Sequence, residues 1–385
     1  MTVPIADPVL GQAEKERVEA VVDDGQLADG PEVRRFEDEF ADFCGTAHGV
    51  ATSNGTTALH AALHALGIGS GDRVLTTPFS FVATANAVRH CGADVGFVDV
   101  DPETYALDAD ALAARLRESG GDIDAVVVVH LYGLPADVGR LRDLADEHDV
   151  ALVEDACQAH GATFEGERVG SFGDVGCFSF YPTKNATAGE GGMVVTDDAE
   201  TADRVRQFVD HGQAADGTHE TLGHNFRMTS VAAAIGRVQL DRLPDFTETR
   251  RDHARYLTDA LADLPVTTPT DPPGRTHVYN QYTVRTDDRA QFREVLADAG
   301  VDTAVYYPTP IHQEPAYDGV DVDADLSHAE RAANEVVSLP VHPALDRADL
   351  DRVVAAVRDY AEESDRQSCS GSGPTTLATR TEGDT

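Results

Sequence analysis

The run Ala125-Val126-Val127-Val128-Val129 is apolar at every position and rich in β-branched residues. A continuous apolar run of this kind is typical of a strand that is covered on both faces in a parallel sheet. Six similar short runs flank it, at residues 49–52, 73–77, 95–98, 151–154, 175–180 and 193–196. We therefore expect Ala125–Val129 to be a central strand of a seven-stranded sheet.

Helix-like segments separate the earlier runs, at residues 57–66, 81–90 and 109–118. Strands that alternate with helices predict an α/β fold, in which a mostly parallel sheet carries helices on both faces. The last two runs are joined by a loop and not by a helix, so we expect one strand to be antiparallel.

A second lobe is expected because 385 residues exceed what one hydrophobic core usually organises. Beyond residue 230 the pattern predicts helices at 231–240, 246–264, 289–299, 329–337 and 349–363, with strands at 279–285 and 303–306. We expect a large domain at 1–240 and a smaller C-terminal α/β domain at 241–363. Residues 364–385 are poor in apolar side chains, which predicts a disordered tail.

The charge balance is strongly acidic, with 68 acidic and 30 basic residues and a net charge of −38. Such a surface argues against a nucleic-acid partner and against an anionic membrane. The only lysines are Lys15 and Lys184. Repulsion among so many negative charges would weaken a compact fold in dilute buffer, whereas molar salt screens it by shortening the Debye length to about 3 Å. We therefore interpret the surface as halophilic, built for a high-salt cytoplasm. A generically acidic protein would not explain the missing lysines.

Several signals are absent from the sequence. Residues 1–10 lack the basic start and apolar stretch of a signal peptide, and no window approaches the ~20 apolar residues of a membrane helix. The five cysteines form no C-x-x-C pair. His60 and His64 have a metal-compatible spacing, but no third ligand is evident. We expect a cytoplasmic protein with free thiols, no metal and no membrane partner.

Lys184 is the most informative single residue. It is retained in Phe178-Ser179-Phe180-Tyr181-Pro182-Thr183-Lys184, directly after an apolar run, in a chain nearly emptied of lysine. A partly desolvated lysine at a strand end can lose its proton and form a Schiff base. Pyridoxal phosphate uses this chemistry, and it also needs an anion near its ring nitrogen, a phosphate cradle and a flat apolar surface. A solvated lysine retained by chance remains the alternative.

Candidates for these three needs follow from their positions. Asp155 closes the run at 151–154, at the sheet edge where ligands of open α/β sheets bind. The segment 53–57 precedes a helix, whose first N–H groups favour a phosphate, and Gly55 allows close approach. Ser179 could donate a hydroxyl to the same phosphate, and Phe81 could cover the ring. Each residue also has an ordinary interpretation, as a cap, a turn or part of the core.

Taken together and in this order, several segments resemble the DegT/DnrJ/EryC1/StrS family of nucleotide-sugar aminotransferases. The similarity runs from about residue 4 to 343 and rests on segments at 30–37, 54–59, 78–84, 129–133, 154–162, 178–184, 189–192, 223–228 and 306–308. It implies the fold-type I fold of pyridoxal-phosphate-dependent transferases. That fold has a large three-layer αβα domain with a mostly parallel seven-stranded sheet, and a smaller C-terminal α/β domain.

The resemblance also implies roles for single residues. Lys184 would link covalently to pyridoxal 5'-phosphate and move the catalytic proton, and Asp155 would pair with the ring nitrogen. The remaining cofactor-binding residues would be Gln158 near the ring hydroxyl, Phe81 against the ring, and Gly55, Thr56 and Ser179 on the phosphate. Asn225 would reach the cofactor of a neighbouring subunit in a homodimer with shared active sites. The resemblance assigns no role to His160.

The implied reaction moves an amino group from glutamate to a nucleotide-linked ketosugar, for surface glycan biosynthesis. The segment 185–192 is similar to that of perosamine-type enzymes, which favours a 4-keto-6-deoxyhexose. Three alternatives stay open: another fold-type I enzyme that acts on a free amino acid, a non-catalytic regulator that binds pyridoxal phosphate, and a purely structural acidic protein.

Overall fold

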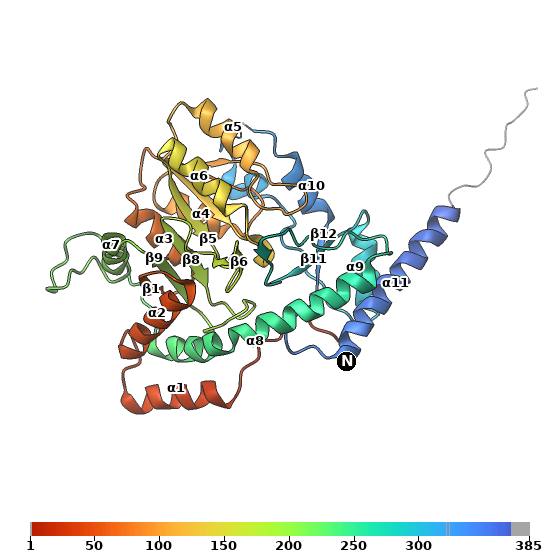
Figure 1. The fold of residues 1–385 in the computed structure, drawn as a ribbon, viewed down its shortest axis with the longest axis horizontal. Helices are drawn as coiled ribbons and strands as arrows, with labels where there is room; N and C mark the ends of the chain where they lie inside the picture. Colours follow the sequence, from red (N-terminus) through yellow and green to blue (C-terminus); the bar gives the residue numbers. More distant parts are fainter. Residues whose placement is uncertain (1, 321, 323, 371–385) are drawn as a thin grey trace, which may run out of the picture.

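A computed structural model describes residues 2–320, 322 and 324–370. The large lobe is built on a seven-stranded sheet with helices on both faces (Figure 1). In spatial order its strands are β1 (His48–Thr52), β9 (Gly192–Thr196), β8 (Val175–Ser179), β5 (Ala151–Asp155), β4 (Ala125–Val129), β2 (Arg73–Thr76) and β3 (Asp94–Phe97). Strand β9 runs antiparallel to the other six strands of this sheet. The predicted fold class, with its seven strands and one antiparallel strand, is confirmed.

Strand β4 shows why the fold buries both faces of the sheet. All five of its residues are buried, and the first four side chains alternate between two different cores. Val127 packs with the face covered by α3 (Gly55–Ala65), α4 (Ala83–His90) and α7 (Ala199–Val209), whereas Val128 packs with the face covered by α5 (Ala109–Ser119) and α6 (Val138–His148). The apolar run is therefore a central strand covered on both faces, as the sequence pattern predicts.

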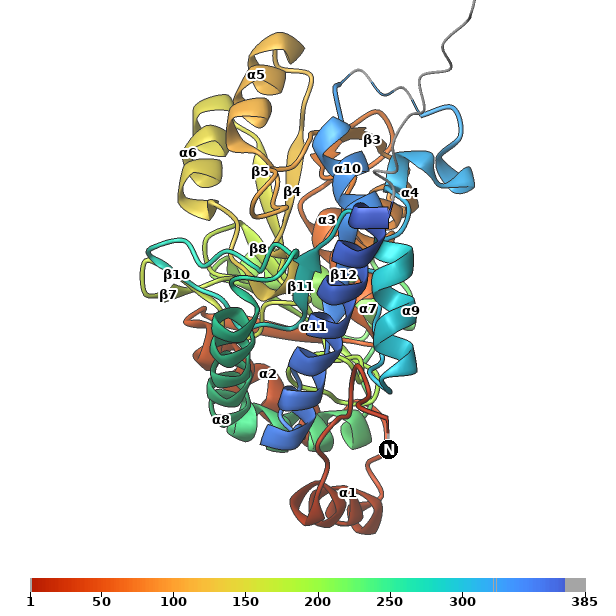
Figure 2. The same ribbon diagram turned by 90° about the vertical axis from the view of Figure 1, so that its right-hand side faces the viewer.

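The second lobe has its own core, in which Tyr282, Phe292 and Val353 are fully buried. Its two-stranded antiparallel sheet pairs β11 (Tyr282–Arg285) with β12 (Val336–Leu339). The helices α9 (Arg289–Asp298) and α11 (Arg347–Ser370) lie side by side, and α10 (Ser327–Glu335) leads into β12 (Figure 2).

Smaller elements complete the chain. The long helix α8 (Ser230–Leu261) contacts both α1 (Gln12–Asp24) and α2 (Pro31–Cys44). A small sheet joins β10 (Arg275–Thr276), β6 (Thr163–Phe164) and β7 (Glu167–Arg168). Three short 3-10 helices are η1 (Leu131–Gly133), η2 (Ile311–Gln313) and η3 (Pro315–Tyr317). Among the described residues no helix is long and apolar enough to cross a membrane.

Helix α8 differs from the sequence expectation of two helices at 231–240 and 246–264. It is continuous through Pro244, because its buried side chains serve both lobes: Leu243 packs in the core of the large lobe, and Leu257 in that of the second lobe. This tertiary packing outweighs the one hydrogen bond that a proline removes. The domain boundary that we expect at residue 240 falls within this helix, and Val3 packs in the second core.

Other elements also differ from their predicted bounds. Residues 303–306 form no strand but a single bridge between Ala304 and Ser338. The helix expected at 329–337 ends at Glu335, because the next residues pair with β11. Helix α11 continues to Ser370, so the predicted disordered tail is wrong for 364–370, where Arg366 pairs with Glu362 one turn earlier. The rest of that tail, 371–385, lies outside the described residues.

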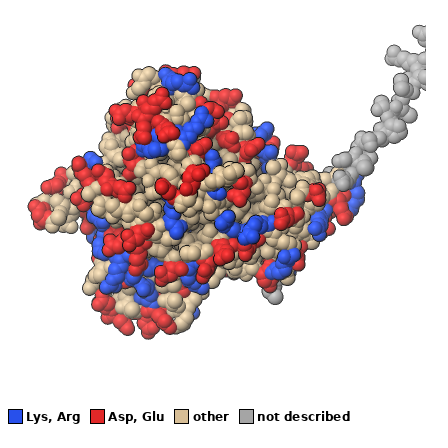
Figure 3. Space-filling model, viewed as in Figure 1, with Lys and Arg blue, Asp and Glu red and all other residues tan. Residues whose placement is uncertain are grey.

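Acidic side chains predominate on the visible face of the molecule, with arginines scattered among them (Figure 3). Several arginines form multiple ion pairs. Arg237, for example, pairs with both Glu32 and Glu39. The two lysines differ, since Lys15 is exposed on α1 whereas Lys184 faces a cavity.

Candidate active site

A cavity of about 770 Å³ lies where the carboxyl ends of three central strands meet the second lobe. Val129, Asp155 and Ser179, the last residues of β4, β5 and β8, line it from the large lobe. Its opposite wall comes from the second lobe, with Gln281, Tyr306 and Tyr307. The cavity brings together seven of the predicted site residues, namely Gly55, Thr56, Phe81, Asp155, Gln158, Ser179 and Lys184.

Lys184 lies in the loop that follows β8, and its backbone N–H donates to the Tyr181 carbonyl at 2.9 Å. Burial lowers the pKa of Lys184 from its usual value, although Cys157 and Asp155 act in the opposite direction. Because the uncharged amine is the nucleophilic form, this environment favours attack on a carbonyl group.

Asp155 ends β5 between two parallel neighbours, β4 and β8, and is 6% exposed. Its Oδ2 accepts a hydrogen bond from the Thr84 hydroxyl at 2.8 Å, and its Oδ1 accepts one from the Cys157 N–H at 3.2 Å. The carboxylate is therefore oriented by two donors while it lines the cavity. A carboxylate held in this way can pair with a protonated ring nitrogen.

The segment predicted to hold a phosphate lies at the start of α3. Asn54 caps the helix, because its Oδ1 accepts from the Thr57 N–H at 3.0 Å. A Cβ on Gly55 would lie 2.7 Å from the Ser179 Cβ and 3.0 Å from the Cys157 Sγ. Only glycine fits this close approach, and the first turn of the helix lines the cavity. The donor set and its shape suit a phosphate group.

Gln158 is held at both ends of its amide. Its Oε1 accepts from the Tyr132 N–H at 2.7 Å, and its Nε2 donates to the Tyr307 hydroxyl at 3.0 Å. The second N–H of Nε2 is left for a ligand in the cavity. Phe81 is 55% exposed at the cavity wall, with its ring centroid 5.9 Å from that of Tyr307. An exposed aromatic face at this place suits a flat ligand ring.

The predicted site residue Asn225 and the unassigned residue His160 do not line this cavity. Asn225 is exposed in the segment after α7, where its Oδ1 accepts from Arg227, and it does not line the cavity of its own chain. His160 is fully buried, with ring centroids 5.4 Å from Phe178 and 5.5 Å from Phe180. Burial lowers the pKa of His160 to about 3, so it is a neutral core residue.

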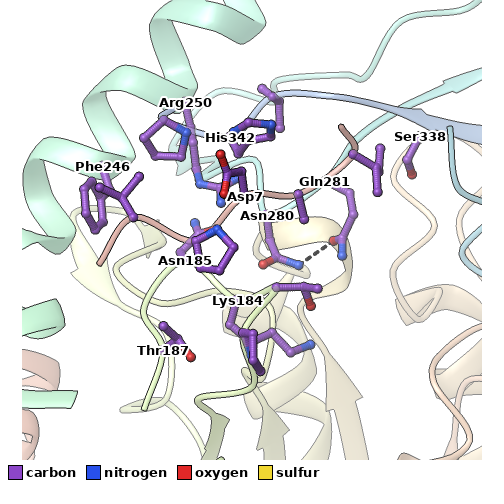
Figure 4. A pocket seen from close by; sticks show the side chains of 18 of the residues that line it. Asp7, Lys184, Asn185, Thr187, Phe246, Arg250, Asn280, Gln281, Ser338 and His342 are labelled. Atoms are coloured by element: carbon purple, nitrogen blue, oxygen red, sulfur yellow. Dashed lines mark hydrogen bonds between the residues drawn. The ribbon is translucent and has the colours of Figure 1, made fainter. Parts of the chain in front are cut away.

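A second, smaller chamber of about 30 Å³ lies beside Lys184 on the side of the N-terminal segment (Figure 4). It shares Lys184, Gln281 and Tyr306 with the main cavity, and Arg250 from α8 also lines it. Arg250 donates to the Tyr279 carbonyl at 3.1 Å, and burial lowers its pKa to about 10. A polar chamber of this volume has room for about two water molecules.

Sequence reasoning missed Thr84, Tyr132 and Gln281 as parts of the site. Thr84 lies within a segment of the family pattern, and Tyr132 within another, but the patterns carry no indication of what these side chains contact. The histidines His60 and His64 pack around Phe208. In the described part of the chain no group of three or more His, Cys, Asp or Glu could hold a metal ion.

Comparison with known proteins places this geometry in context. The sequence profile of the DegT/DnrJ/EryC1/StrS aminotransferase family matches residues 8–358. The dTDP-3-amino-3,4,6-trideoxy-alpha-D-glucose transaminase of Streptomyces venezuelae is 40% identical over 353 residues, which cover 90% of this chain and 91% of that protein. A solved structure of S. venezuelae DesV in complex with a ketimine intermediate has a TM-score of 0.89 and 38% identity, and covers 94% of this chain and 99% of that one.

Two other relatives are named for different activities. The pleiotropic regulatory protein of Geobacillus stearothermophilus is 39% identical over 86% of this chain and 90% of its own length. The GDP-perosamine synthase of Caulobacter vibrioides is 37% identical over 92% of this chain and 97% of its own length. The similarity to each of these proteins therefore extends over both lobes.

Proposed function

The chain belongs to the DegT/DnrJ/EryC1/StrS aminotransferase family, and we propose that it uses pyridoxal 5'-phosphate to transfer an amino group from glutamate to a nucleotide-linked ketosugar. The observation that carries this proposal is the meeting of Lys184, Asp155 and the start of α3 at one cavity. These groups come from three separate strand ends, and together they supply an amine, an anion and a phosphate cradle.

The residues present fit the cofactor. When bound, pyridoxal phosphate supplies a carbonyl that condenses with amines and a ring that withdraws electrons. Lys184 would hold it covalently, and Asp155 would keep a proton on the ring nitrogen. Gly55, Thr56 and Ser179 would bind the phosphate. Phe81 would cover the ring face, and Gln158 would donate its remaining N–H to the ring hydroxyl.

Proton transfer is assigned to Lys184. Its lowered pKa increases the fraction of uncharged amine near neutral pH, so the amine can accept a proton from a substrate carbon and return it. Asp155 has a separate proposed role at the ring nitrogen, for which hydrogen bonds from Thr84 and from the Cys157 N–H orient its carboxylate.

The acceptor is proposed to be a nucleotide-linked 4-keto-6-deoxyhexose, on the basis of segment 185–192 and of the similarity to GDP-perosamine synthase. A second candidate is a 3-keto sugar, because the S. venezuelae relative, named for a 3-amino sugar, is slightly more similar. Both acceptors require the same donor half-reaction, in which glutamate loses its amino group and leaves as 2-oxoglutarate. The product would enter a surface glycan.

The assembly is proposed to be a homodimer with shared active sites, in the cytoplasm of a halophile. Asn225 is exposed and outside its own cavity, which leaves it free to reach the cofactor phosphate of a second copy. The charge of −38 and the presence of only two lysines support the high-salt setting.

Product formation tests the proposal. The protein is incubated in molar salt with glutamate and one acceptor at a time, either a nucleotide-linked 4-keto sugar or a nucleotide-linked 3-keto sugar. The 2-oxoglutarate and the aminated sugar are then quantified by mass spectrometry. Lys184→Ala should abolish both products, whereas Lys15→Ala, which removes the exposed lysine, should retain full activity. Turnover of glutamate without any sugar acceptor but with a free keto acid would favour an enzyme of free amino acids. Cofactor binding without any donor reaction would favour a regulator.

A further inference from the structure

Tyr132 occupies a strained position at the carboxyl end of the central strand. It lies in η1, directly after β4, with φ 60° and ψ 1°. This left-handed conformation is costly for a residue with a side chain. Tyr132 is 4% exposed. A strained and buried non-glycine residue persists only where surrounding contacts hold it in place.

All three polar groups of Tyr132 are bonded to residues of the cavity wall. Its N–H donates to Gln158 Oε1 at 2.7 Å, and its carbonyl accepts from the Gln281 N–H at 3.2 Å. Its hydroxyl donates to the Tyr306 carbonyl. Gln158 follows β5 of the large lobe, whereas Gln281 directly precedes β11 and Tyr306 lies two residues after Ala304, which bridges Ser338 of β12.

We infer that Tyr132 is a positioning residue, which fixes the second-lobe wall of the cavity relative to the amide of Gln158. The inference rests on the proposed function for what the cavity binds. The large lobe supplies most of the cofactor contacts, and the second lobe supplies the wall that a sugar would meet. A single residue that is bonded to both lobes fixes the distance between them before any ligand binds. Such preorganisation raises affinity without a new contact.

The neighbouring residue makes a close approach to the segment 278–280, which precedes β11. A Cβ on Gly133 would lie 2.8 Å from Val278 Cγ2 and 3.0 Å from the Asn280 nitrogen. The Gly133 carbonyl also accepts from the Val278 N–H at 3.0 Å. Residues 132 and 133 are therefore both bonded to the chain that leads into β11, through Gln281 and Val278.

Tyr132→Phe separates the hydroxyl from the backbone bonds. The substitution removes the bond to Tyr306 and leaves both backbone bonds, to Gln158 and to Gln281, in place. We therefore expect the cofactor contacts to persist while the second-lobe wall loosens. The dissociation constant for pyridoxal phosphate should stay within about twofold, and the KM for the ketosugar should rise about tenfold with little change in kcat.

Tyr360→Phe is the matched control. Its hydroxyl lies 2.9 Å from the Thr286 hydroxyl, is buried in the core of the second lobe and does not line the cavity. Both variants lose one buried hydroxyl bond, so both should lower Tm by a similar amount. Only Tyr132→Phe should change the KM, which distinguishes positioning from a general loss of stability.

A second measurement needs no substrate. Hydrogen exchange is followed in the peptide 302–312, which is anchored by the Ala304 N–H on the Ser338 carbonyl and by the Ile311 N–H on the Pro78 carbonyl. Exchange in this peptide should quicken at least about fivefold in Tyr132→Phe and remain as in the wild type in Tyr360→Phe.

The outcomes separate the two proposals. Unchanged exchange in Tyr132→Phe overturns the positioning role, whatever the catalytic activity. Faster exchange with an unchanged KM, in an enzyme whose wild type is active, also overturns it. A wild type that aminates no ketosugar counts against the proposed function, and the exchange result then still decides whether Tyr132 holds the second-lobe wall.

Discussion

Gly55→Ala tests the phosphate cradle through packing alone. The added Cβ would lie 2.7 Å from the Ser179 Cβ and 3.0 Å from the Cys157 Sγ. The Ser179 Cβ is fixed to the end of β8, so it cannot rotate away. Such overpacking costs about 1–3 kcal/mol, whereas alanine in place of a helical glycine regains about 0.5–1 kcal/mol. The free energy of unfolding should therefore fall by about 0–2.5 kcal/mol.

The effect on the cofactor should be larger than the effect on stability suggests. The added Cβ displaces Ser179, which is a proposed phosphate ligand. We expect the dissociation constant for pyridoxal phosphate to rise at least about tenfold, which corresponds to about 1.4 kcal/mol.

The assay titrates the apoprotein with pyridoxal phosphate in molar salt and follows the visible absorbance, with urea unfolding measured in parallel. Gly69→Ala is the control, because its Cβ would meet only the Cys91 carbonyl oxygen, at 3.9 Å. Gly69→Ala should bind the cofactor as the wild type does. The cradle assignment is refuted if Gly55→Ala keeps wild-type affinity.

Two further predictions concern buried polar groups. Thr84→Val removes the hydroxyl that donates to Asp155 and should lower kcat/KM about tenfold, since bonds to charged groups contribute about 1.5–3 kcal/mol. Thr76→Val, whose hydroxyl bonds the Val127 carbonyl away from the cavity, should lower only the stability, and equal kinetics in both variants would contradict the role of Thr84. His160 has a pKa lowered from 6.5 to about 3 by burial, so below pH 6.5 the unfolded chain binds a proton that the native state does not. The free energy of unfolding should fall by up to about 1.4 kcal/mol per pH unit as the pH decreases from 6 to 4. His160→Phe should remove this part of the slope in urea unfolding, and an unchanged slope would show that the imidazole is not buried in its neutral form.

The fold could be predicted from sequence where the signal is local. The runs that become the seven strands are short, apolar and β-branched, and Ala125–Val129 has the bounds of β4. Lys184 and Asp155 could be placed together from sequence because each follows such a run, and the carboxyl ends of parallel strands meet at one edge of a sheet. Both residues line the cavity. The structure also places Gly55 against Ser179, two residues that the sequence analysis assigns to one phosphate, and their role there stays a prediction.

The rest depends on contacts between distant segments. Helix α8 continues through Pro244 because two cores support it, and no local pattern reports this. The bonds of Tyr132 to Gln158 and Tyr306 join residues 26 and 174 positions apart. Neither the spacing nor the composition of the sequence could indicate them. Asn225 acts beyond its own chain in the proposed assembly, so one chain does not test its role.

The most direct test of the central claim is the absorbance spectrum of the protein, reconstituted with pyridoxal phosphate in molar salt, before and after addition of glutamate. The account predicts a visible band that requires Lys184, bleaches with glutamate and persists in Lys15→Ala. Lys184→Ala should show no such band, because no other buried amine lines the described cavity. A reconstituted wild-type protein without the band, or an equal band in Lys184→Ala, would contradict the assignment of this cavity as the active site of an aminotransferase.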